Sequence, residues 1–203
     1  MNTVLILLLF ALAWQMLRVR YQRTHILLLG QHLSSLQLER HMETLTEGYT
    51  RAIGETDEIR QRQVLEMFTQ NEAAVATQSL ALANAMQKES LQATSMTTLP
   101  FCLPYAEQFL PGITRDFRKL LHIHAAGLRY VVDNQGGWDA KNRAFHLSAE
   151  LYLLQHSCHW FCKSRAVADA RLLMRHQVQH QKVLESVSDV TRLAYQQWLE
   201  TKT

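Results

Sequence analysis

The chain opens on an uninterrupted apolar run, and its hydrophobic positions become periodic only afterwards. From Thr3 to Leu17 the sequence carries no charge, and arginines follow at once at positions 18, 20 and 23. As an α-helix rising ~1.5 Å per residue, the run spans a little over ~20 Å, which is short beside a hydrocarbon core of ~30 Å. Trp14 and Tyr21 suit the membrane interface, and Arg18 can reach toward the headgroups. We predict a membrane anchor with a basic flank over residues 1–23.

Two other interpretations of this segment remain open. A cleaved signal peptide has its positive charge before the apolar run and small residues at a cleavage site after it, which is not the order found here. A short apolar run can also be a buried helix of a soluble protein. For an anchor, the excess of positive charge after the span predicts the topology. We expect a single-pass protein of the cell membrane, with its N-terminus outside and the bulk of the chain in the cytoplasm.

Residues 24–89 show helical periodicity in two stretches. In the first, the apolar stripe changes to the opposite side of the helix near Ser34 and Ser35, so either the helix bends there or different partners cover its two halves. Gly54 marks a break before the second stretch. We predict a helical hairpin with coiled-coil-like character. Its apolar positions are Ile26, Leu29, Leu33 and Leu36, then Leu38, Met42, Leu45, Tyr49 and Ala52, and finally Val64, Phe68, Val75, Leu82 and Met86.

All three prolines fall in residues 90–111, which we predict to be a linker. Helical periodicity resumes at Gly112, stops at the Asp133–Gly137 turn, continues from Ala140 to Cys162, and returns from Ala166 to Trp198. A turn near Ser164 is favoured, because one helix through it would be unusually long. We therefore predict an antiparallel helical bundle over residues 112–203.

Composition supports an all-α fold and narrows the function classes. The chain of 203 residues is 47% hydrophobic and has only 7 glycines and 3 prolines, which favours long uninterrupted elements. A formal charge of +3 without a dense basic run argues against nucleic acid as a partner. Three cysteines without framework spacing indicate a reducing compartment.

Motifs for catalysis are missing from the sequence. It contains no phosphate-binding glycine loop, no Gly-x-Ser-x-Gly elbow and no pair of carboxylates flanked by loops. Cys158 and Cys162 lie one helical turn apart, which differs from the CxxC spacing of thiol oxidoreductases, so we expect small core residues. We expect no catalytic residues, no cofactor and no enzyme activity.

The ten histidines are the one candidate for site chemistry. His176 and His180 are four residues apart on a predicted helix, a chelating geometry for zinc or another transition metal. Three antiparallel helices would place His124 level with His180 and one turn from His176. These three residues form the metal-site hypothesis, with a pH-sensitive layer as its variant. The alternative for each is a structural histidine that is hydrogen-bonded in the core.

These expectations favour a protein that interacts with other proteins at a membrane. The change of apolar face near Ser34, and the apolar character of both sides of the 140–162 helix, imply more surface than one small bundle covers. We predict a membrane-anchored helical adaptor or assembly subunit, with protein partners or self-association. The alternative function is a metal- or pH-sensing bundle.

Overall fold

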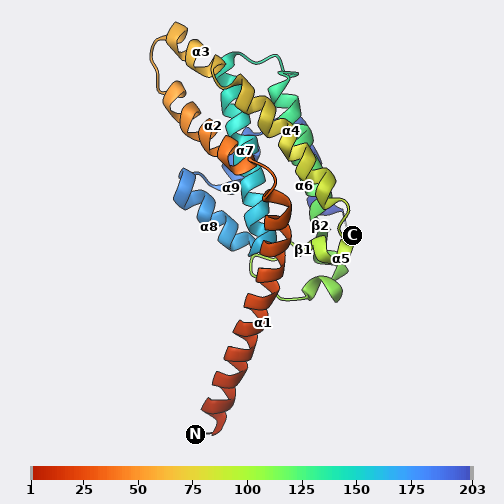
Figure 1. Ribbon diagram of the computed structural model, residues 1–203. Coiled ribbons are helices and arrows are strands. Elements are labelled where there is room, and N and C mark those ends of the chain that lie inside the picture. Colours follow the sequence, from red (N-terminus) through yellow and green to blue (C-terminus); the bar gives the residue numbers. More distant parts are fainter. Residues whose placement is uncertain (1, 202–203) are drawn as a thin grey trace.

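The computed structural model describes residues 2–201, and these are mostly helical, as predicted. A helical body carries one helix that projects far beyond it (Figure 1). The described helices are α1 (Asn2–Leu33), α2 (Leu38–Ile53), α3 (Glu58–Glu66), α4 (Thr69–Met86), α5 (Leu91–Thr94), α6 (Phe117–Val132), α7 (Ala140–Cys162), α8 (Arg165–His176), α9 (His180–Ser186) and α10 (Asp189–Glu200). Two 3-10 turns, η1 (Ala106–Gln108) and η2 (Pro111–Ile113), lie between the short strands β1 (Ser95–Thr97) and β2 (Thr114–Asp116).

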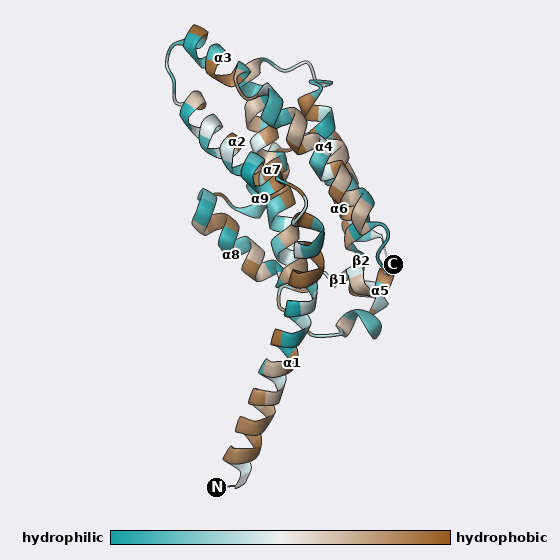
Figure 2. Ribbon diagram, in the orientation of Figure 1, coloured by the Kyte–Doolittle hydropathy of each residue, from teal (hydrophilic) through white to brown (hydrophobic). Residues whose placement is uncertain are grey.

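The projecting helix is α1. Every side chain from Thr3 to Leu17 is exposed, and Figure 2 shows this end of the helix as hydrophobic. Burial begins at Gln22 and continues at His25 and Leu29, where the same helix packs on the body. Among the described helices, α1 is the one long and apolar enough to cross a membrane.

The predicted change of apolar face near Ser34 coincides with a break between α1 and α2. The Ser34 hydroxyl donates a hydrogen bond to the Gln31 carbonyl, 2.8 Å away, as α1 ends. The second predicted stretch is also divided, between α3 and α4, where the Phe68 ring meets Tyr49 edge-on. Gly48 leaves the room for this ring, because a Cβ there would overlap Phe68. The hairpin pattern therefore corresponds to four helices.

A strand pair replaces part of what the sequence analysis assigned to helix and linker. β1 pairs antiparallel with β2, with Met96 opposite Arg115. The indole of Trp160 donates to the Thr97 carbonyl, and that of Trp198 donates to the Asp116 carbonyl. The prediction that helix resumes at Gly112 is wrong for 112–116. The 3-10 turn η2 continues to Ile113, and Thr114–Asp116 is the extended strand β2, whose Asp116 carbonyl accepts from the distant Trp198.

The C-terminal part turns where predicted and then breaks twice more. Ser164 caps α8 by accepting a hydrogen bond from the Val167 amide, so the favoured turn is confirmed. The single helix predicted from Ala166 to Trp198 is wrong. It ends at Gln177, which adopts a left-handed conformation (φ 55°), and α10 begins at the capping residue Ser188.

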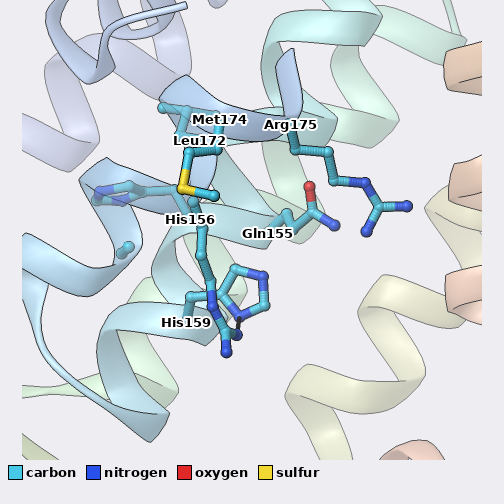
Figure 3. Close-up of a pocket in the computed structure, with 8 residues that line it drawn as sticks. Gln155, His156, His159, Leu172, Met174 and Arg175 are labelled. Carbon is cyan, nitrogen blue, oxygen red and sulfur yellow. Dashed lines mark hydrogen bonds between the residues drawn. The ribbon is translucent and has the colours of Figure 1, made fainter. Parts of the chain in front are cut away.

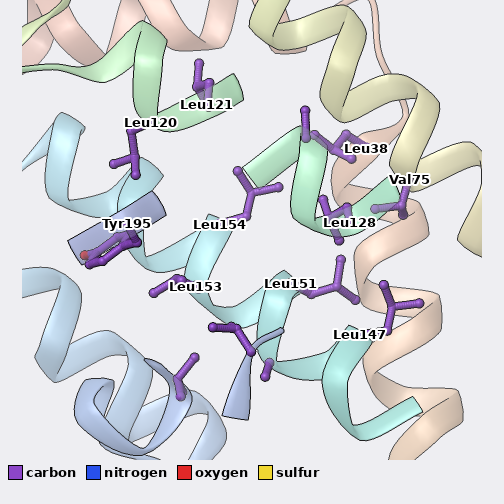
Figure 4. Packing of buried hydrophobic residues seen from close by; sticks show 14 of the residues in the cluster. Leu38, Val75, Leu120, Leu121, Leu128, Leu147, Leu151, Leu153, Leu154 and Tyr195 are labelled. Carbon is purple, nitrogen blue, oxygen red and sulfur yellow. The ribbon is translucent and has the colours of Figure 1, made fainter. Parts of the chain in front are cut away.

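One hydrophobic core runs through the body (Figure 4). Leu38 and Val75, from the segment predicted as a hairpin, belong to the same buried cluster as Leu147 and Leu151 of α7. Residues 24–89 and 112–201 therefore share their core, and the division into domains at 90–111 stays a prediction.

A buried ion pair joins these two segments. Arg143 on α7 lies 2.6 Å from a carboxylate oxygen of Glu72 on α4, which is almost fully buried. The Tyr49 hydroxyl of α2 donates to the same carboxylate. Because a buried carboxylate is stable only with such partners, the pair fixes the register of α2, α4 and α7.

Candidate functional site

Helix α7 organises the polar interior of the body. It packs against α6, α8 and α9 and also touches α1 and α2, so most of its faces are covered. Three of its polar residues, Glu150, His156 and Ser157, are almost fully buried. Buried polar groups require hydrogen-bond partners, and the neighbouring helices supply most of them, although within residues 2–201 His156 Nδ1 has none.

Two of the predicted metal ligands lie beside the same tyrosine. His124 Nε2 on α6 is 2.9 Å from the Ser157 hydroxyl oxygen, and His180 Nε2 at the start of α9 is 3.2 Å from the Tyr195 hydroxyl oxygen. The Tyr195 ring centroid lies 6.3 Å from that of His124 and 5.9 Å from that of His180. The structure therefore brings His124 and His180 to one aromatic cluster.

The third predicted ligand is placed differently. The His176 ring stacks on Tyr152 at a centroid distance of 4.0 Å, and its Nε2 is 2.9 Å from the Gln155 amide oxygen. The histidine next to His180 is instead His156, at 4.3 Å between ring centroids. The predicted ligand set leaves out His156, whose contacts with Asp169 and His180 come from α8 and α9 and are not indicated by any local spacing.

The three predicted ligands direct their Nε2 atoms to different side chains. A zinc site requires ring nitrogens that converge on one point, whereas the Nε2 atoms of His124, His176 and His180 face a serine, a glutamine and a tyrosine. Within residues 2–201 no group of three or more His, Cys, Asp or Glu side chains is arranged to hold a metal ion. The geometry gives the metal interpretation no support.

Burial controls the charge of the cluster. It lowers the pKa of His124 to about 3 and that of His180 to about 4, with a smaller contribution from His156 in each case. Both rings are therefore neutral near neutral pH. The Asp169 carboxylate, 2.8 Å from His156 Nε2, has its pKa lowered by that hydrogen bond. Asp169 is the acidic partner of this buried layer.

Glu150 is the carboxyl group least accessible to water in this region. Its Oε1 accepts hydrogen bonds from the Ser188 amide and hydroxyl, at 3.1 and 2.8 Å. A Cβ on Gly127 would overlap Thr191 Oγ1 and lie 2.7 Å from Glu150 Oε2, so glycine provides the space for this group. Burial raises the pKa of Glu150 to about 7, although the hydrogen bonds from Thr191 and Ser188 act to lower it. Glu150 therefore changes charge near physiological pH.

The accessible part of the site is a groove between α2 and α8, with α7 as its floor. Its volume is about 470 Å³, and its floor includes Leu151, Leu154 and Cys158. One wall presents glutamates of α2 at intervals of four residues, Glu39, Glu43 and Glu47. We call this the α2–α8 groove.

The opposite wall of the α2–α8 groove has Arg175 as its cation, because burial lowers the pKa of the neighbouring His176. It carries Arg175 and His176 of α8, and the Arg175 guanidinium lies 3.5 Å from the Glu43 carboxylate. Both of these side chains are more than half exposed, so their ion pair is weak and can exchange for another partner. An apolar floor between walls of opposite charge is suited to binding a partner segment that carries both charges.

A smaller pocket of about 400 Å³ adjoins the groove between α7 and α8 (Figure 3). Gln155, His159 and Arg175 line both cavities. His159 is held by Arg171, whose Nη1 is 3.0 Å from the imidazole Nδ1. Burial and this guanidinium lower the pKa of His159 to about 4, so the ring is uncharged at neutral pH. The pocket supplies polar contacts at one end of the groove.

Comparison of the chain with protein-family models, with curated proteins and with solved structures finds no match. His124, Ser157 and Glu150 are almost completely shielded from solvent, so no substrate reaches them in this conformation. The accessible chemistry lies in the α2–α8 groove, where shape and charge favour binding.

Proposed function

We propose that this chain is a membrane-anchored interaction protein that acts as an adaptor or an assembly subunit of a membrane-associated complex. The observation that carries the proposal is the exposed apolar run Thr3–Leu17, which belongs to the same helix that packs into the body. Thirteen of its fifteen residues are apolar, and their exposure to water would be costly, whereas a bilayer would bury them. The helix is continuous, so a membrane span would hold the body at a fixed distance from the bilayer.

The α2–α8 groove is the proposed partner site. Its glutamate wall and arginine wall favour a protein segment of mixed charge with an apolar face, from another protein or a second copy of this chain. We propose a binding role rather than an enzymatic one, without a cofactor or nucleic acid. The arginines that follow the apolar run support an N-terminus outside and a body in the cytoplasm of the cell. The three free cysteines agree with that reducing side.

Two measurements on the full chain in native membranes test the proposal. Alkaline carbonate washing should leave the protein in the membrane fraction. A photo-crosslinking residue at Glu47, in the groove, should give a discrete crosslinked species, and one at Glu58, an exposed glutamate at the start of α3, should not. Release by carbonate would refute the anchor. Equal crosslinking at both positions, or none at Glu47, would refute the groove as the partner site.

A pH-sensing role is the second candidate, and Glu150 is the observation that favours it. A fully buried carboxyl group with a pKa near 7 couples protonation to the hydrogen bonds between α7 and Ser188, the residue that caps α10. This role requires no metal. It predicts that the stability of the body depends on Glu150 between acidic and neutral pH, as developed in the Discussion.

A further inference from the structure

The segment between β1 and β2, residues 98–113, forms the end of the body from which the exposed part of α1 projects (Figure 1). Its contacts with α1 centre on the helical turn that contains Tyr21. The Tyr21 hydroxyl donates to Glu107 Oε2 at 3.1 Å, and the Tyr21 and Tyr105 rings meet edge-on at a centroid distance of 5.3 Å. The position of this segment along α1 is therefore well defined.

The other side of α1 is fixed at the same level. Gln22 Nε2 donates to the Lys163 carbonyl at 3.4 Å, and the Lys163 ammonium donates to Gln22 Oε1 at 3.3 Å. With contacts on both sides at one turn, α1 cannot slide relative to the end of the body. The depth of the apolar run in a bilayer therefore sets the height of residues 98–113.

The length of α1 places this level at the membrane surface. A hydrocarbon core of ~30 Å needs about 20 helical residues, and counting from Thr3 these end close to Tyr21. Tyr21 would then lie at the lipid–water boundary, with Arg18, Arg20 and Arg23 around it. Residues 98–113 would meet the headgroup layer.

This segment exposes aromatic and aliphatic side chains where that layer would lie. Phe101 is 59% exposed, Phe109 77% and Leu110 45%. Aromatic side chains are favoured at membrane interfaces, and basic residues nearby attract anionic headgroups. Exposed aromatic rings contribute no stability on a surface that faces water, whereas the membrane interface would bury them.

We propose that residues 98–113 are a second membrane contact, in which Phe101 and Phe109 insert into the interfacial layer of an anionic bilayer. This inference rests on the proposed anchor and adds an attachment point to it. Two attachments restrict the rotation and tilt of the body, so the α2–α8 groove faces a fixed direction relative to the membrane. Arg20 and Arg23, both exposed on α1, supply the attraction for anionic lipid.

Tryptophan fluorescence of the full chain in vesicles of phosphatidylcholine and phosphatidylglycerol tests this contact. The background variant is Trp14→Phe, which removes the indole of the apolar run. Phe109→Trp is then compared with Ile59→Trp, a matched probe that is 71% exposed. Ile59 belongs to α3, the helix at the opposite end of the body (Figure 1). The proposal expects blue-shifted emission and a loss of intensity with brominated lipid for Phe109→Trp, and neither change for Ile59→Trp.

The outcomes distinguish failure of the second membrane contact from failure of the membrane anchor. If carbonate-washed vesicles retain the chain but brominated lipid leaves Phe109→Trp unquenched, the second contact is wrong and the anchor stands. A blue shift without quenching would assign the rings to a protein contact and would also overturn the proposal. Release of the chain by carbonate would remove the anchor and this inference together. Quenching that persists in vesicles of phosphatidylcholine alone would overturn the role of anionic lipid.

Discussion

Replacing Glu150 with glutamine should make the stability of the protein less dependent on pH. In the folded state burial raises the pKa of Glu150 from 4.5 to about 7, whereas in the unfolded chain the carboxyl group is in water. The folded state therefore binds the proton more tightly. The stability from this group is fully present below pH 4.5 and is lost as the pH rises through about 7.

The change in stability follows from the size of the pKa change of Glu150. At about 1.4 kcal/mol per pKa unit, a rise from 4.5 to about 7 corresponds to about 3 kcal/mol of lost stability across that window. Glutamine resembles the protonated carboxyl group, because it can accept from Ser188 and donate toward Thr191. Glu150→Gln should therefore match the parent protein at acidic pH and exceed its stability by about 3 kcal/mol above pH 7.

Urea unfolding of the detergent-solubilised full chain, followed by the fluorescence of buried Trp160 and Trp198, measures this difference at a series of pH values. Other groups such as His124 titrate in both proteins, so they cancel in the comparison. Glu66→Gln is the matched control, because Glu66 is exposed on α3 and its replacement should give a constant difference. If the difference between Glu150→Gln and the parent is the same at pH 4.5 and above pH 7, the argument from burial is wrong.

Two further predictions concern packing around α7. Gly127→Ala should lower the free energy of unfolding by about 1–3 kcal/mol, because its Cβ would overlap Thr191 Oγ1, whereas Gly112→Ala, where a Cβ meets open space, should change it little. Arg143→Met should cost about 3–5 kcal/mol, because it leaves the buried Glu72 carboxylate without its cation. Thermal unfolding monitored by circular dichroism checks both predictions. An unchanged stability of Gly127→Ala or of Arg143→Met would contradict the packing described here.

The helical character of the chain, and the sites of several breaks, could be predicted from local sequence. The apolar run Thr3–Leu17 stands out without any tertiary information, and Ser164 lies where a helix continuing past α7 would have become too long. Periodicity and capping are local properties, so a single sequence contains them.

Two further features, the start of α10 and the strand pair, depend on contacts between distant residues. Gln177 adopts a left-handed conformation that sequence rules reserve for glycine or asparagine, and Ser188 starts α10 with its hydroxyl bonded to Glu150. The short strands exist where Trp160 and Trp198 donate to their carbonyls. None of these partners is near in the sequence.

The candidate site likewise has some features that local sequence predicts and others that depend on contacts between distant residues. The sequence by itself determined that histidines occupy apolar helical faces and that an apolar helix begins the chain. Only the tertiary structure decided that His180 pairs with His156, that His176 stacks on Tyr152, and that α2 and α8 enclose a groove with walls of opposite charge. Helical spacing fixes which side chains share a face, but which helices meet across that face is decided by the packing of the whole core.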